Sequence, residues 1–122
     1  MLTVTLDKTN AIAVLVPHGA LSADDFKHVA SVIAPYLSQT AKKLNGIVIH
    51  AERFPGWDSF AAFSSHLRFV RGHEKEIARI ALSTDMEVAR LITSIAQHFI
   101  KAQIRVFSYA DFAQAQAWAA GN

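Results

Sequence analysis

The residues best suited to chemistry follow the predicted strands, where serine, histidine and acidic side chains recur. They are His18, His50, Glu52, Ser83, Thr84, Asp85 and Ser108. The carboxyl ends of parallel strands meet at one edge of a sheet, so these residue types could support a Ser-His-Asp hydrolase triad. However, the chain has no Gly-x-Ser-x-Gly turn, and Thr84 and Ser108 are predicted to cap helices. The sequence therefore predicts no enzyme and no catalytic residue.

The histidines and the absence of cysteine argue against a metal centre. His66 and His73 are seven residues apart, which is two helical turns and too far for one ion. The chain has no cysteine, so thiolate zinc sites, iron–sulfur clusters and disulfides are excluded. We expect no metal and no cofactor.

A dense run of aromatic residues follows the third predicted strand. Five of the chain's twelve aromatic residues lie between positions 54 and 69. Phe60, Phe63, Leu67 and Val70 follow helical spacing, which is typical of a buried stripe. Phe54, Trp57 and Phe69 do not all fit that stripe. Together with two arginines, aromatic residues of this stretch could form an exposed contact surface. The contact residues predicted for an apolar ligand or a membrane are Phe54, Trp57, Phe60, Phe69, Arg53 and Arg68.

The basic residues near this stretch allow two interpretations. Arg53, Arg68 and Arg79 are interspersed with glutamates, which is typical of a solvated, salt-bridged surface. The alternative is attraction to anionic lipid headgroups, which contributes about 1 kcal/mol per basic residue near the membrane.

Length and charge narrow the class of protein. A chain of 122 residues is expected to form a single domain, residues 1–122. A net charge of +2 is too small for an electrostatic nucleic-acid binder. No apolar stretch approaches the roughly 20 residues of a membrane span, and the amino terminus does not resemble a signal peptide. We expect a cytoplasmic protein, peripheral at the membrane if it binds lipid, and either a monomer or a homodimer.

The first half of the chain predicts a hairpin followed by a helix. Leu2, Val4 and Leu6 alternate with polar residues, and a short turn separates them from a second strand at 11–16. Ser22 and Asp25 form a capping-box pattern before a helical apolar stripe. Pro35 lies within that stripe and predicts a kink or a restart of the helix near Ala34.

The second half alternates strands and helices. Strands are predicted around Ile47–Ile49, at Ile77–Ser83 and at Gln103–Phe107. Helices are expected to follow each of them, beginning near Asp58, Thr84 and Ser108. Ile80, Leu82, Ile104 and Val106 are expected to be buried in the sheet. The order ββαβαβαβα predicts an α/β fold with a mixed, mostly parallel five-stranded sheet.

Several of these segments together resemble the SpoIIAA-like family, which is related to STAS domains. The resemblance rests on the strand, Pro-Gly-Trp turn and helix of 46–69, on Arg79-Ile80-Ala81, on Ile104–Phe107 and on the closing segment 111–118. It covers nearly the whole chain. It implies an anti-sigma-factor-antagonist-like α/β domain, distantly similar to the lipid-binding CRAL-TRIO fold, with a bacterial, regulatory setting.

The resemblance and the aromatic stretch lead to two functional hypotheses. The first is a non-enzymatic module that binds an apolar or amphipathic ligand, or associates reversibly with a membrane. The second is a STAS-type switch that binds a regulatory protein partner and is controlled by phosphorylation at Ser59. Asp58-Ser59 matches the start of the STAS phosphorylation motif, whereas Phe60 and Ala61 depart from its small residue and glycine.

Overall fold

The computed structural model describes residues 2–40, 44–53, 77–85 and 103–121. The strands are β1 (Leu2–Asp7), β2 (Ile12–Pro17), β3 (Leu44–His50), β4 (Ile77–Ser83) and β5 (Gln103–Phe107). The helices are α1 (Ala23–Thr40), the short 3₁₀ helix η1 (Tyr109–Asp111) and α4 (Phe112–Ala119). The expected α/β class and the strands at Ile77–Ser83 and Gln103–Phe107 are confirmed.

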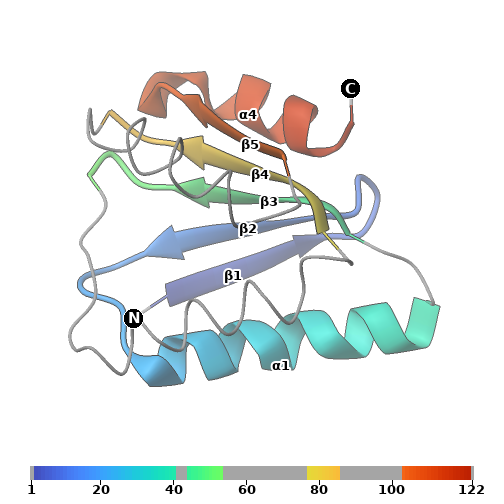
Figure 1. Ribbon diagram of the computed structural model, residues 1–122. Helices are drawn as coiled ribbons and strands as arrows, with labels where there is room; N and C mark the ends of the chain where they lie inside the picture. Colours follow the sequence, from blue (N-terminus) through green and yellow to red (C-terminus); the bar gives the residue numbers. More distant parts are fainter. Residues whose placement is uncertain (1, 41–43, 54–76, 86–102, 122) are drawn as a thin grey trace.

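The five strands form one mixed sheet in the order β1-β2-β3-β4-β5 (Figure 1). β1 pairs antiparallel with β2, as the short turn predicted. The remaining neighbours are parallel, so β2, β3, β4 and β5 have their carboxyl ends at the same edge of the sheet. We call this edge the carboxyl edge.

The turn between β1 and β2 is held by Asp7. Its carboxylate accepts hydrogen bonds from the backbone N–H groups of Thr9 (3.0 Å) and Asn10 (3.1 Å). These bonds lower the pKa of Asp7, with the side-chain amide of Asn10 as the largest cause. Ala11 completes the turn in the left-handed region with φ of 54°. Local side-chain bonding of this kind explains why the chain reverses here.

Helix α1 begins at the capping box that the sequence predicted. The backbone N–H of Ser22 donates to the Asp25 carboxylate at 2.8 Å, and the Asp25 N–H donates to Ser22 Oγ at 3.3 Å. The helix continues through Pro35 without the restart that the sequence allowed (Figure 1). Pro35 is exposed, and the carbonyl of Ser31 that loses its helical partner belongs to an exposed residue and can be hydrated. Burial of the opposite face of α1 offsets the remaining cost.

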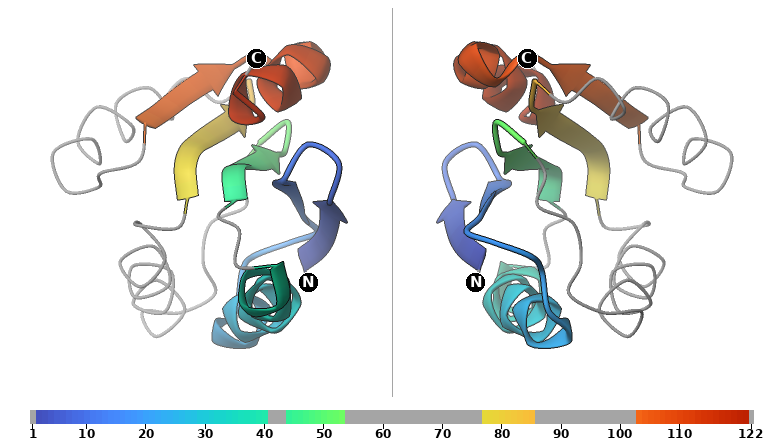
Figure 2. Two further views of the ribbon diagram at one scale, coloured as in Figure 1. Left: turned by 90° about the vertical axis from the view of Figure 1, so that its right-hand side faces the viewer. Right: turned by 90° about the vertical axis from the view of Figure 1, so that its left-hand side faces the viewer.

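The two helices α1 and α4 lie on opposite faces of the sheet (Figure 2). On the α1 face, Phe26, Val29 and Ile33 pack against apolar side chains of the sheet that include Leu15 and Ile47. On the α4 face, the core consists of Ile12, Val14, Val48, Ala81, Ala115 and Ala119. Successive residues of a strand point to opposite faces, so neighbours such as Ile47 and Val48 serve different cores.

Helix α4 approaches β3 closely because its inner face consists of alanines and β3 contributes a glycine. A Cβ atom added to Gly46 would lie 2.5 Å from the carbonyl oxygen of Ala119. At the end of α4, Arg79 of β4 donates to the Trp118 carbonyl at 2.7 Å and lies over the indole ring. These contacts with the sheet therefore fix both the distance of α4 from β3 and the position of its last turn.

The expectation that four strand residues would be buried in the sheet is met only in part. Ile80, Leu82, Ile104 and Val106 are only partly buried. They point to the α1 face, but α1 lies over the β1 side of that face, so neither helix of the described part covers them closely.

Candidate functional site

At the carboxyl edge, the chain leaving β3 is bonded to the end of β4. The backbone N–H of Ala51 donates to the Ser83 carbonyl at 3.0 Å. The Glu52 carbonyl then accepts two bonds, from the Asp85 N–H (3.0 Å) and from Thr84 Oγ1 (3.0 Å). The direction of the chain is thus fixed up to the start of the predicted aromatic stretch at residue 54.

A histidine and a serine meet beside this crossing. His50 Nδ1 lies 3.1 Å from Ser83 Oγ. Ser83 is completely buried, and its hydroxyl also lies within donating distance of the carbonyls of Ser108 (3.3 Å) and Tyr109 (3.4 Å). Ser83 therefore links the ends of β3 and β4 to the segment that follows β5.

The imidazole of His50 lies between two aromatic rings. Its centroid is 4.3 Å from that of Tyr109, with 5° between the planes, and 3.9 Å from that of Phe112, with 17° between the planes. Burial lowers the pKa of His50 below the ordinary value of 6.5. Burial therefore favours the neutral form of the ring, which suits a position between two aromatic rings.

The segment after β5 is capped from a distant part of the chain. Asp85, which follows β4, accepts a hydrogen bond from the Tyr109 N–H at 2.9 Å and so satisfies the first donor of η1. The expected capping by Ser108 was wrong, because its side chain makes no capping hydrogen bond. Asp111, at the start of α4, makes none either. Asp85 occupies the position where a local cap would otherwise bind.

This geometry does not provide a catalytic nucleophile. The structure brings together His50, Ser83, Thr84, Asp85 and Ser108, as the parallel topology predicted, but Ser83 has no exposed surface. A nucleophilic hydroxyl must reach its substrate, whereas this one faces two carbonyls and an imidazole. His18 is not part of the group, since its Nε2 pairs with Thr3 Oγ1 at 2.8 Å. The Ser83–His50 pair therefore organises the edge rather than attacking a substrate.

Of the predicted contact residues, only Arg53 lies within the described residues, where it is exposed at the carboxyl edge. The other predicted contact residues, Phe54, Trp57, Phe60, Phe69 and Arg68, and the predicted phosphorylation site Ser59 lie outside the described residues. Arg79, considered with the basic group, instead contacts Trp118.

Sequence reasoning missed Tyr109 and Phe112 as members of the edge. Tyr109 is 37% exposed, and among the described residues it is the large hydrophobic side chain with most exposure. The available signal was position: both residues follow the fifth strand closely, and the carboxyl ends of β3 and β5 face the same edge.

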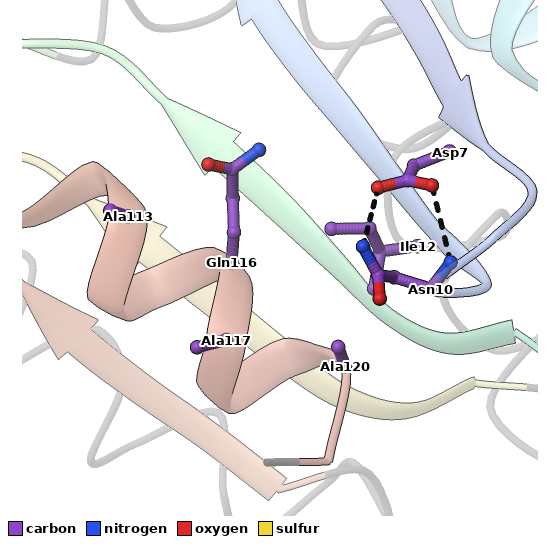
Figure 3. Close-up of a pocket in the computed structure, with 7 residues that line it drawn as sticks. All are labelled: Asp7, Asn10, Ile12, Ala113, Gln116, Ala117 and Ala120. Carbon is purple, nitrogen blue, oxygen red and sulfur yellow. Dashed lines mark hydrogen bonds between the residues drawn. The ribbon is translucent and has the colours of Figure 1, made fainter.

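A shallow depression of about 260 Å³ lies at the opposite edge, between the β1–β2 turn and α4 (Figure 3). Its polar residues are Asp7, Asn10 and Gln116. The carboxylate of Asp7 is already bonded to the backbone and the side chain of Asn10. In the part of the chain that the structure describes, no three potential metal-ligating side chains gather, and no helix is long and apolar enough to cross a membrane.

Comparison with known proteins identifies the same fold. A family model described as SpoIIAA-like matches residues 12–120. A crystal structure of an uncharacterized protein of the DUF3478 family with a SpoIIAA-like fold, from Shewanella loihica PV-4, superposes with a TM-score of 0.76. The two chains are 18% identical, and the match covers 98% of this chain and 92% of that one. A search of curated proteins finds no match.

Proposed function

Because the chain belongs to the SpoIIAA-like family, we propose that it is a regulatory protein-interaction module without catalytic activity. Its partner docks at the carboxyl edge, on the surface formed by Tyr109 and the exposed residues Glu52, Arg53 and Asp85. The family and its fold support a protein-interaction role, and the edge provides the surface.

The observation that carries this proposal is the way Tyr109 is held. One face of its ring lies on His50, and its backbone N–H is bonded to Asp85, yet over a third of the residue is exposed. An aromatic side chain that is already ordered loses little conformational entropy when a partner covers it. Tyrosine is enriched among the residues that dominate protein–protein binding energies.

The charges around Tyr109 favour a protein over an anionic membrane. The exposed residues that adjoin the crossing of β3 and β4 are two acids, Glu52 and Asp85, and one base, Arg53. A surface with both signs of charge suits a polar rim around an aromatic contact. It offers less attraction to anionic headgroups than a purely basic surface would.

The test is affinity capture with three forms of the full chain. Tyr109→Ala should lose the captured partner, whereas Gln114→Ala, a change at an exposed position of α4, should retain it. Tyr109→Phe should also retain most binding because it keeps the stacked ring. Thermal melts would establish that all three variants are folded. Recovery of the same partners by folded Tyr109→Ala would refute the proposal.

A finer version of the function places the aromatic stretch after β3 in contact with an apolar ligand or a membrane. The described chain reaches this stretch at the carboxyl edge, with exposed Arg53 at its start. The proposed contacts are Phe54, Trp57, Phe60, Phe69, Arg53 and Arg68. In that case the protein should float with anionic liposomes, and Trp57→Ala should float less. Equal flotation of both forms would leave protein binding as the function.

The regulatory version uses Ser59 as a phosphorylation site. A phosphate would add about −1.5 to −2 charge to the stretch that follows β3, and would repel an acidic partner. Ser59→Glu should then abolish capture without changing the melting temperature much, while Ser59→Ala should not. Identical capture by both variants would exclude this control.

A further inference from the structure

We propose that the contact of His50 with Ser83 and Tyr109 is a pH-sensitive latch, which holds η1 at the carboxyl edge while His50 is neutral and loosens it when His50 is protonated. The latch deepens the proposed function, because it would regulate the presentation of Tyr109. Its own existence can nevertheless be tested without any partner.

The geometry gives His50 contacts on three sides. Tyr109 of η1 and Phe112 of α4 cover the two faces of the ring at 4.3 and 3.9 Å, and Ser83 of β4 meets Nδ1 at 3.1 Å. Among the described residues, no hydrogen bond reaches Nε2. A second proton at Nε2 would therefore add a charge to a half-buried ring without a bonded acceptor.

The charged groups of the surrounding elements do not pair with the imidazole. Asp85, after β4, directs its carboxylate to the Tyr109 N–H. Asp111 of η1 forms no ion pair with His50, and no other carboxylate of the described part does so. Glu52, two residues after His50, is exposed. Burial is the cause that lowers the pKa of His50, and no described carboxylate opposes it.

The direction of the switch follows from proton linkage. With η1 released, His50 would be hydrated and would titrate near 6.5. With η1 closed it binds a proton less tightly, so acidification below pH 6.5 favours release until the closed-state pKa is passed. Each unit of difference between the two pKa values makes release about tenfold easier. The attraction of aromatic rings for a cation acts in the opposite direction, and a dominant attraction would raise the pKa of His50.

The test is NMR of the full chain between pH 7.5 and 5.0. The readouts are the titration of the His50 ring and the hydrogen-exchange protection of the Tyr109 amide, corrected for the intrinsic effect of pH. In the parent, we expect His50 to titrate below 6.5 and Tyr109 protection to fall on acidification, by the factor that the difference between the open-state and closed-state pKa values sets. The amide should report opening directly because it is bonded to Asp85 in the closed state.

Three variants make the result specific. His50→Gln retains an amide that can donate to Ser83 but does not titrate, so its Tyr109 protection should be independent of pH. His50→Phe is a second variant without a titrating side chain, for use if His50→Gln destabilises the carboxyl edge. His18→Gln is the matched control, since His18 is bonded to Thr3 and lies outside this cluster, and it should behave as the parent does.

Three outcomes would overturn the latch: constant Tyr109 protection in the parent, the same loss of protection in the non-titrating variants, or titration of His50 above 6.5. Capture of a partner at pH 7.5 is a separate measurement. If folded Tyr109→Ala captures the same partners as the parent while the latch behaves as expected, only the proposed function is refuted.

Discussion

Replacing Gly46 by alanine tests whether the close approach of α4 to β3 is a requirement of the fold. The added Cβ would lie 2.5 Å from the Ala119 carbonyl oxygen, 2.8 Å from the Ala119 Cβ and 3.0 Å from its carbonyl carbon. Ordinary contacts begin at 3.4 Å, so the end of α4 must retreat by about 0.9 Å. None of these atoms can move away by a change of rotamer.

The expected loss of stability is about 2 kcal/mol. Overpacking of a tight core costs about 1–3 kcal/mol, and a contact with backbone belongs at the upper end. Glycine-to-alanine changes also restrict the unfolded chain, which returns about 0.4–1 kcal/mol. A retreat of α4 would further disturb the bond between Arg79 and the Trp118 carbonyl.

Equilibrium urea unfolding, followed by far-ultraviolet circular dichroism, would measure this effect. Gly46→Ala should lower the urea midpoint without changing the slope, and lower the melting temperature by roughly 7 °C. Adding Ala119→Gly should restore only part of the loss, because it removes the Cβ contact and leaves the carbonyl contact. A midpoint equal to or above that of the parent would refute the inferred contact.

Two further predictions concern burial and capping. Leu44→Ala should lower the free energy of unfolding by about 2–5 kcal/mol because Leu44 is fully buried. Leu82→Ala should lower it by roughly 1 kcal/mol because Leu82 is partly buried. Equal losses in urea unfolding would contradict the described core. Burial would raise the pKa of Asp25, but hydrogen bonds from Ser22 lower this pKa below 3.8 overall. The ionised Asp25 carboxylate therefore contributes its full stabilisation above about pH 4, and this contribution is lost as the pH falls through the folded-state pKa. Asp25→Ala, which removes the carboxylate that accepts from the Ser22 N–H, should cost about 1 kcal/mol of unfolding free energy at pH 7 and less near pH 2, as measured by urea unfolding at both pH values; a loss that is independent of pH would show that the Asp25 carboxylate does not take part.

Local patterns predicted most of the described fold. The alternation of Leu2, Val4 and Leu6, the short turn after Asp7 and the Ser22–Asp25 pair each act over a few residues, and each is present as expected. The helix does not restart at Pro35 because the local cost of the proline is offset by tertiary burial of the opposite helix face. The depth of burial of Leu82 was misjudged, since it depends on where α1 lies over the sheet.

Only the grouping of residues at the carboxyl edge, which follows from the strand topology, could be predicted for the candidate site. Parallel strands placed His50, Ser83 and Asp85 at one edge, and the structure confirms that grouping. The capping of Tyr109 by Asp85 joins residues 24 positions apart, and the stacking of His50 depends on the exact placement of η1. Such long-range contacts leave no periodic pattern in the sequence. The role of the aromatic stretch stays a prediction.

The order of the strands has a consequence for how the protein is made. Each strand of the sheet pairs with the strand that precedes it in the chain. During synthesis, the amino-terminal hairpin can form first, and every later strand can add to the growing edge as it leaves the ribosome. None of the five described strands has to be inserted between two that are already paired. The segment that carries Tyr109 and α4 follows all five strands in the chain, so the carboxyl edge is completed only after the last of these strands has been made.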